Sequence, residues 1–315
     1  MNIGLDMMGG DFAPLEAVKG LKAFLSVNSH AATLFCIGDE ALIQPLLTEY
    51  EVLSPTIHLV HAPEAIGYNE HPTKALKEKP QSSIAIGFQL LATGKIDAFI
   101  SAGNTGAMLV GAMFTIKAIE GLIRPCVSGI VPKTNGETGM ILDVGLNADC
   151  KPEQLNQFAI LGSLYAQYIL NIPNPKIGLL NVGEEEGKGN LLAQATFPIL
   201  KENHSINFIG NIEGRDLFGT KADVIVCDGF TGNIVLKMAE TVYDLAETRN
   251  FHNDEYFNRF HYENYGGSPV LGVAKPVILG HGISSAKAFT NMIQLATQMV
   301  ETDVCTKMAE SFKAS

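Results

Sequence analysis

Short apolar runs alternate with longer helix-like stretches along the chain, and this alternation constrains the fold more than any other feature. Several runs are almost entirely apolar, for example TLFCIG at 33–38 and VIVC at 224–227. Parallel strands covered on both faces have this composition, whereas half-exposed strands alternate apolar and polar residues. The sequence therefore predicts an α/β protein with a mostly parallel, doubly wound sheet in three α/β/α layers.

The alternation can be followed element by element. The predicted strands are Asn2–Met7, Thr33–Gly38, Ile57–His61, Asp97–Ala102, Val127–Val131, Met140–Val144, Lys176–Val182, Ile206–Gly210, Asp223–Cys227 and Val277–Gly280. The predicted helices include Leu15–Ser29, Ser82–Thr93, Thr105–Ile119, Pro152–Leu170, Asn190–Lys201, Asn233–Glu247 and Ser284–Thr302. No repeat or linker interrupts them, so we expect a single α/β catalytic domain over residues 1–315.

One segment breaks the alternation. Residues 249–265 read RNFHNDEYFNRFHYENY, and we expect an inserted helical hairpin or loop at about 245–265. Its aromatic side chains either pack within the hairpin or a subunit interface, or contact a membrane or partner. Its acidic residues are unfavourable for an anionic bilayer, which attracts lysine and arginine. The aromatic residues are Phe251, Tyr256, Phe257, Phe260, Tyr262 and Tyr265.

Composition excludes several classes of protein. The chain of 315 residues is 46% hydrophobic with a net charge of −11, which argues against general disorder and against nucleic-acid binding. Five cysteines without C-x-x-C spacing predict neither a disulfide framework nor a zinc site. The start MNIGLDMMGGDF does not resemble a secretory signal, and the apolar stretches are too short to span a bilayer. We expect a cytoplasmic protein.

Glycine-rich turns follow the predicted strands and precede helices. They are MMGGD at 7–11, SAGNTG at 101–106, DVGLN at 143–147, NVGEEEGKGN at 181–190, CDGFTGN at 227–233 and LGHGISS at 279–285. Ligands of open α/β sheets bind at the carboxyl ends of strands, and glycine there permits close backbone approach. The alternative for each turn is a tight turn with a helix cap. Together the six turns predict one shared site for a small anion.

The common nucleotide and catalytic motifs are missing from the sequence. The loop GEEEGKG at 183–189 is one residue short of a phosphate loop and has Gly189 in place of the magnesium-binding hydroxyl. Its glutamates would repel a triphosphate, but Lys188 can still hold one small anion. No dinucleotide fingerprint, serine-hydrolase elbow or H-E-x-x-H motif occurs, so we expect no cofactor and no metal. His281 is the one histidine at a glycine-rich strand end, where it serves either the site or the turn.

The motifs, in order, resemble the phosphate acyltransferase (PlsX) family of bacterial phospholipid synthesis. The matching segments are LDMMGGDFAP, SAGNTGA, LDVGLNADC, LLNVGEEEGKGN, FIGNIEGRD, ADVIVCDGFTGNIVLK, YGGSPVLG and HGISSAKA. The resemblance implies transfer of an acyl group from acyl-[acyl carrier protein] to inorganic phosphate. It also implies a fold similar to isocitrate/isopropylmalate dehydrogenases and phosphotransacetylases, a homodimer, and peripheral membrane association in some members. Leu146 and the pair Ala274-Lys275 depart from the family pattern.

That reaction requires a phosphate cradle and donors for a developing oxyanion, and we assign candidate residues on this basis. The predicted catalytic residues are Lys188, Asn104 and Asn233. The predicted phosphate- or acyl-binding residues are Asp6, Gly9, Gly10, Asp11, Gly103, Thr105, Gly106, Asn147, Gly187, Gly189, Thr231, His281 and Ser284. Helix capping or turn formation is the alternative role for each polar residue among them.

The carrier protein is acidic as a class, so docking on a chain of net charge −11 requires a local basic patch. The densest one comprises Lys74, Lys77, Lys79 and Lys95, for which a solvated helix face is the alternative. Two rival functions stay open on the residues alone. One is a dehydrogenase of similar fold, and the other is a non-catalytic protein that binds phosphate or acyl groups.

Overall fold

The computed structural model describes residues 1–28, 32–52, 54–251 and 254–313. The chain divides into two compact units. The first unit comprises Met1–Ala118 and Tyr262–Cys305, and the second comprises Ile119–His261 and Thr306–Ser315. Within the described ranges, no helix is both long enough and apolar enough to cross a bilayer.

The first unit is built on a sheet with the strand order β3-β2-β1-β4-β11-β10. Its strands are β1 Asn2–Asp6, β2 Thr33–Gly38, β3 Ile57–His61, β4 Ala98–Ser101, β10 Ser268–Leu271 and β11 Val277–Leu279. All neighbours run parallel except β10 and β11. The central strands β1 and β4 are buried almost throughout, which explains the apolar residues at 3–5 and 98–100.

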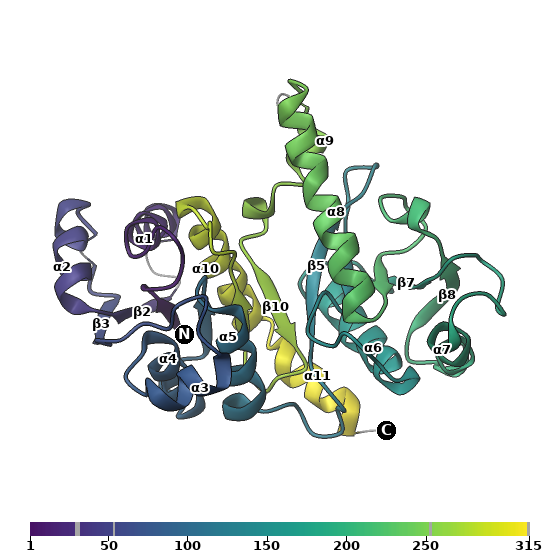
Figure 1. The fold of residues 1–315 in the computed structure, drawn as a ribbon, viewed down its shortest axis with the longest axis horizontal. Coiled ribbons are helices and arrows are strands. Elements are labelled where there is room, and N and C mark those ends of the chain that lie inside the picture. Colours follow the sequence, from purple (N-terminus) through teal and green to yellow (C-terminus); the bar gives the residue numbers. More distant parts are fainter. Residues whose placement is uncertain (29–31, 53, 252–253, 314–315) are drawn as a thin grey trace. The chain divides into compact units, whose positions relative to one another are not determined.

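Helices cover both faces of this sheet (Figure 1). They are α1 Leu15–Val27, α2 Glu40–Glu49, α3 Pro72–Glu78, α4 Ser83–Ala92, α5 Thr105–Gly111 with the π-helical turn Ala112–Ile116, the 3-10 turn Tyr262–Asn264, and α10 Ala286–Glu301. On one face α1 packs closely on α10, because Gly20 leaves room for Phe289. On the other face Phe88 of α4 packs edge-to-face on Phe99 of β4, with ring centroids 5.2 Å apart.

The second unit has the strand order β5-β6-β9-β7-β8, parallel except for the β5–β6 pair. Its strands are β5 Cys126–Pro132, β6 Thr138–Leu142, β7 Lys176–Leu180, β8 Asn207–Ile212 and β9 Val224–Val226. Its helices are α6 Pro152–Tyr168, α7 Leu191–Glu202, the 3-10 turn Gly214–Asp216, α8 Gly229–Thr248 and α9 Glu255–Asn258, while α11 Val304–Lys313 begins in the first unit. Gly162 of α6 faces Leu142, whereas Leu236 of α8 faces Gly129, the neighbour of Ile141. Successive residues of a strand point to opposite faces, so α6 and α8 cover opposite faces.

The predicted α/β class is confirmed: each unit has a mostly parallel sheet with helices on both sides. The sequence prediction did not name β10, α2, α3 or α11, whereas α9 lies within the insert that it expected at about 245–265. It also began α8 at Asn233, whereas the helix begins at Gly229 because Asp228 caps it. Ser29, the predicted end of the first helix, lies outside the described residues.

The aromatic insert contains α9, and its residues 252 and 253 lie outside the described part of the chain. The Tyr256 and Phe260 rings meet edge-to-face at 5.3 Å, and Phe260 also meets Phe218 at 5.0 Å. Arg259 ties the segment to the β5–β6 hairpin by donating to the Lys133 and Glu137 carbonyl oxygens. These contacts favour packing within the unit as the role of the Tyr256 and Phe260 rings.

Candidate functional site

Three of the six glycine-rich turns lie together in the first unit, because the neighbouring parallel strands β1, β4 and β11 end at the same edge of the sheet. The turn after β1 joins the turn after β11 through a hydrogen bond of 2.7 Å from the Asp11 N–H to the Gly282 carbonyl oxygen. Gly9 packs against the backbone of Gly103 so closely that a Cβ at position 9 would lie 2.5 Å from the Gly103 nitrogen. Gly10 adopts a φ of +109°, which favours glycine.

Asp6 stabilises these turns through hydrogen bonds. Its carboxylate is 1% exposed and accepts hydrogen bonds from the Ser101 hydroxyl at 2.6 Å and the Met8 N–H at 3.0 Å. Ser101 in turn accepts from the Gly103 N–H at 2.9 Å. Burial raises the pKa of Asp6, and these hydrogen bonds oppose the rise. Asp6 therefore acts on the site through the backbone of the turns.

Asn104 is buried, and both the oxygen and the nitrogen of its side-chain amide form hydrogen bonds. Its Oδ1 accepts from the Ala107 N–H at 2.9 Å and caps α5, while Nδ2 donates to the Gly67 carbonyl oxygen at 2.9 Å. Thr105 is exposed at the same turn, and Gly106 packs against Pro72. Asn104 therefore has the helix-capping role, which was the alternative to its predicted catalytic role. The hydroxyl of the neighbouring Thr105 is the group that a ligand could reach.

The turn after β11 is held by its own residues. Ser284 is buried and donates through Oγ to the His281 carbonyl oxygen at 2.5 Å. The His281 ring lies 4.4 Å from the Tyr262 ring. Tyr68, which the sequence prediction omitted, donates to the Ala102 carbonyl oxygen at 2.9 Å and lies beside Gly282. It belongs to a loop without a recognisable motif, so only the fold could reveal it.

In the second unit, the turns after β6 and β9 are joined. The Gly229 N–H donates to the Asn147 carbonyl oxygen at 2.7 Å. Asn147 is buried, and its Nδ2 donates to Asp143 at 2.9 Å and to the Pro125 carbonyl oxygen at 2.8 Å. Asn233 is exposed on the first turns of α8, with its side chain beside Gly145. Of these two predicted residues, Asn233 is the accessible one.

The loop that carries Lys188 follows β7. Asn181 donates through Nδ2 to the Lys188 carbonyl oxygen at 3.1 Å, and the Lys188 N–H donates to the Glu185 carbonyl oxygen at 3.1 Å. The side chain of Lys188 is exposed and passes over Gly183. Among the described residues its ammonium group forms no ion pair, so it remains available to an anion. Gly187 is open to solvent, and Gly189 has a φ of +93°.

Two of the three glutamates of this loop form ion pairs with lysines. Glu184 pairs with Lys221 at 2.6 Å, and Glu186 pairs with Lys201 at 2.5 Å. These pairs reduce the repulsion that Glu184 and Glu186 would exert on an anion at Lys188.

Among the residues that the structure describes, one group of carboxylates has a spacing that could hold a metal ion, namely Glu184, Glu213 and Asp216. Lys221 donates to Glu184 and Asp216, while Arg215 pairs with Glu213. Basic side chains therefore already balance this group.

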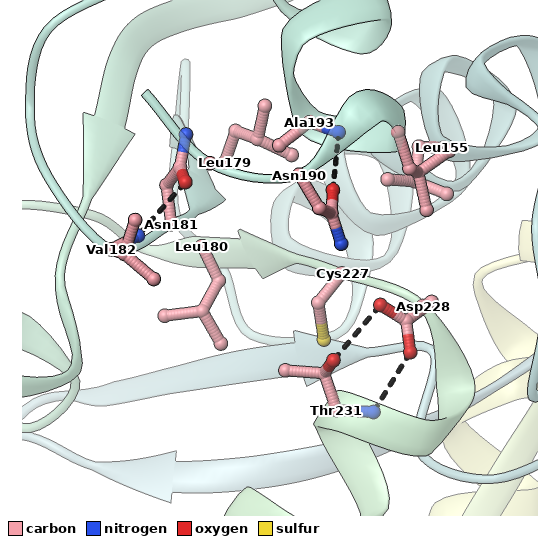
Figure 2. Close-up of a pocket in the computed structure, with 12 residues that line it drawn as sticks. Leu155, Leu179, Leu180, Asn181, Val182, Asn190, Ala193, Cys227, Asp228 and Thr231 are labelled. Carbon is pink, nitrogen blue, oxygen red and sulfur yellow. Dashed lines mark hydrogen bonds between the residues drawn. The ribbon is translucent and has the colours of Figure 1, made fainter.

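Beside the Lys188 loop, a cavity of about 220 Å³ opens in the second unit (Figure 2). It is lined by Leu155, Leu179, Leu180, Asn181, Val182, Gly189, Asn190, Leu192, Ala193, Cys227, Asp228 and Thr231. Thr231 donates to Asp228 through both its N–H at 2.8 Å and its hydroxyl at 2.9 Å. Asn190, another residue that the prediction omitted, caps α7. The signal for it was an asparagine directly before an apolar helix, the same signal that singled out Asn104.

The predicted docking lysines divide into two kinds. Lys79 is held by Glu70 at 2.7 Å and by the Ala65 carbonyl oxygen at 2.9 Å, and Lys74 lies 3.9 Å from Glu78. Lys77 and Lys95 are exposed and form no ion pair within the described ranges.

The convergence of all six glycine-rich turns on one anion stays a prediction. Within the first unit a hydrogen bond joins the turns after β1 and β11, and within the second unit a hydrogen bond joins the turns after β6 and β9.

Comparison with known proteins gives consistent results. Residues 1–248 and 251–307 match the family model described as "Fatty acid synthesis protein". The phosphate acyltransferase of Dictyoglomus turgidum is 43% identical, covering 98% of this chain and 97% of its own. That of Aquifex aeolicus is 39% identical, covering 99% and 97%. A phosphotransacetylase structure from Streptococcus pyogenes superposes with a TM-score of 0.70 at 18% identity, covering 96% of this chain and 94% of that one.

The likeness to the phosphotransacetylase is a likeness of fold, because 18% identity is too low to carry more. The likeness to the curated relatives extends over nearly the whole length of both chains at 39–43% identity. On the family model and these relatives together, the chain belongs to the fatty acid synthesis protein family that includes the phosphate acyltransferases.

Proposed function

We propose that the chain is an acyltransferase that moves a fatty acyl group from acyl-[acyl carrier protein] to inorganic phosphate, giving acyl phosphate and free carrier protein. The observation that carries this proposal is the 43% identity to a phosphate acyltransferase over 98% of the chain. We further propose that the fold is the three-layer isocitrate/isopropylmalate dehydrogenase type, acting as one catalytic domain with the aromatic insert. The dehydrogenase and non-catalytic alternatives have no comparable support from sequence relatives.

The proposed reaction is a direct displacement. A phosphate oxygen attacks the thioester carbonyl carbon, a new C–O bond forms, the C–S bond breaks, and the thiolate takes a proton. Because a thiol is a good leaving group, the enzyme chiefly has to hold the phosphate, orient it and stabilise the oxyanion.

The proposed roles follow from exposure and available donors. Lys188, exposed and without an ion pair among the described residues, binds phosphate and the developing negative charge. Asn233 and Thr105 are exposed donors of the same kind. Asp6 and Asn147 are buried, so they position the turns, and Asn104 does the same through its cap.

We also propose a homodimer, on the basis of an apolar stripe on α8. Ile234, Met238 and Leu245 are 48%, 66% and 59% exposed, and their spacing places them on one face of the helix. A cytoplasmic location with peripheral contact to the cell membrane is the corresponding proposal for localisation.

Phosphate-dependent release of free carrier protein from a palmitoyl-loaded carrier tests the function. Replacement Lys188→Ala should lower the turnover by about 10²- to 10³-fold, the usual effect of removing one oxyanion donor, without changing the thermal stability. Lys176→Ala is the matched control, because Lys176 is an exposed lysine of the same unit that forms no ion pair among the described residues. Release that does not depend on phosphate would overturn the function, and normal turnover by Lys188→Ala would overturn the role of that residue.

A further inference from the structure

The cavity beside the Lys188 loop has two chemically different parts (Figure 2). Leucine and alanine side chains form one part of its wall: Leu155, Leu179, Leu180, Leu192 and Ala193. Polar side chains from four residues belong to the same lining, namely Asn181, Asn190, Asp228 and Thr231. An apolar wall with a few placed polar groups is the usual composition of a small-molecule site.

Asn190 is the polar residue that can meet a ligand. Its Oδ1 accepts from the Ala193 N–H at 2.9 Å, which fixes the orientation of the amide. Figure 2 shows the amide nitrogen turned away from the helix and toward Cys227. Nδ2 donates to no other group in the described part of the chain. By contrast, both carboxylate oxygens of Asp228 already accept hydrogen bonds from Thr231.

A second cavity of about 610 Å³ adjoins the first, and the two share Asn190, Leu192, Asp228 and Thr231. Large apolar side chains lie exposed along them: Val182, which lines the first, is 77% exposed, and Phe230, which lines the second, is 64% exposed. Leu191, next to Asn190 in the chain, is 86% exposed. Exposed apolar side chains gathered at a cavity mark a surface that meets an apolar ligand.

We propose that the smaller cavity receives the acyl chain of the thioester substrate and that Asn190 Nδ2 donates to the thioester carbonyl oxygen. This inference rests on the proposed acyl transfer to phosphate. Lys188 precedes Asn190 by two residues on the same loop, so one short segment would carry both the phosphate ligand and the carbonyl ligand. As the phosphate oxygen bonds to the carbonyl carbon, the carbonyl oxygen becomes an oxyanion and the hydrogen bond from Asn190 strengthens.

Asn190→Ser separates catalysis from capping. Serine caps helices about as well as asparagine, so the thermal stability should be unchanged, whereas the amide donor is lost. We expect the turnover to fall by about 10²- to 10³-fold with a nearly unchanged KM for phosphate. Asp39→Ser, the same kind of exchange at the N-cap of α2, is the control. Full turnover by a folded Asn190→Ser variant would refute the role of the amide.

Substitutions that fill or enlarge the cavity test whether its apolar wall receives the acyl chain. Ala193→Leu adds volume inside the cavity, and Ala195→Leu adds the same volume at an exposed position of the same helix. We expect Ala193→Leu to lower the ratio of palmitoyl to butyryl transfer at least about tenfold, since one or two methylene groups decide such a fit. Leu180→Ala, which enlarges the cavity, should raise that ratio. Unchanged ratios in both folded variants would exclude the cavity as the acyl site.

A binding measurement distinguishes this inference from the proposed function. Calorimetric titration with palmitate requires neither phosphate nor turnover, and Ala193→Leu should weaken binding at least about tenfold relative to Ala195→Leu. A wild-type protein that binds palmitate in this way but releases no carrier protein would refute the proposed reaction and leave the cavity assignment standing. A wild-type protein that turns over while all cavity variants bind palmitate equally would refute the cavity alone.

Discussion

Asn147 donates two hydrogen bonds to one oxygen of the buried Asp143 carboxylate, from its N–H at 2.6 Å and from its Nδ2 at 2.9 Å. The other carboxylate oxygen accepts from the Val127 N–H at 2.9 Å. Burial still raises the pKa of Asp143, because these donors do not fully replace water. The turn at 143–147 is therefore organised around an internal carboxylate.

This relationship predicts a loss of stability in Asn147→Ala. The substitution leaves Asp143 and the Pro125 carbonyl oxygen without their amide donor, which should lower the free energy of unfolding by about 1–3 kcal/mol. Urea unfolding measures the change. Asn233→Ala is the control in the same unit, since that side chain is exposed and should change the stability by less than about 0.5 kcal/mol. Equal stability of the two variants would contradict the bracing role of Asn147.

The raised pKa of Asp6 predicts that the free energy of unfolding depends on pH. Because burial raises its pKa above the ordinary value of 3.8, the folded protein keeps this proton to a higher pH than the unfolded chain does. The stability that Asp6 contributes is complete below the unfolded pKa and is lost as the pH rises through the folded pKa. Asp6→Asn cannot titrate. Its free energy of unfolding minus that of the wild type should therefore increase between about pH 4 and about pH 7, as measured by urea unfolding. A difference that stays constant or decreases would show that the folded pKa is not raised.

The close packing around Gly9 predicts that any larger residue at this position lowers the stability. A Cβ there would lie 2.5 Å from the Gly103 nitrogen and 2.6 Å from Asp6 Oδ2, and backbone cannot give way as a flexible side chain does. Gly9→Ala should cost about 1–3 kcal/mol or more of stability and disturb phosphate-dependent turnover. Gly214→Ala is the control, since no atom lies within 4 Å of a Cβ at that glycine. A Gly9→Ala variant as stable as Gly214→Ala would mean that the two turns separate easily.

The sequence predicted the features that depend on local pattern. The apolar runs identified β1 and β4 because both are buried almost throughout, and the glycines after them mark turns that do lie together. The exposure of Lys188 also follows from its polar loop. β10 escaped prediction because it has only four residues and contains Pro269, which is unfavourable in most strands.

Roles that depend on distant partners could not be predicted. Asn104 was a candidate donor, but its amide meets the carbonyl oxygen of Gly67, which is 37 positions away in the chain. Asn147 likewise meets Pro125, which is 22 positions away. Only the packing of α5 against the loop at 67–70, and of the 143–147 turn against the segment before β5, decides which polar groups remain accessible. Asn190 illustrates the converse, since its cap was predictable and its place in a cavity was not.

The exposed lysines predict where the carrier protein docks. Lys79 is already held by Glu70, so reversing its charge would disturb the loop, whereas Lys77 and Lys95 can be reversed without breaking an ion pair among the described residues. The double variant Lys77→Glu/Lys95→Glu should raise the KM for acyl carrier protein by about tenfold, since losing attraction to an acidic partner costs about 1.4 kcal/mol. The KM for a small acyl thioester should stay unchanged, because that substrate makes no contact with the docking surface.

Salt and a matched charge reversal complete this test. Raising the ionic strength from about 0.1 M to about 1 M shortens the screening length from about 10 Å to about 3 Å, so the wild type and the double variant should become similar. The double variant Lys22→Glu/Lys117→Glu reverses two exposed lysines of the same unit and therefore controls for net charge. If this control raises the KM for acyl carrier protein as much as Lys77→Glu/Lys95→Glu does, general repulsion explains the effect. In that case Lys77 and Lys95 do not form the docking surface.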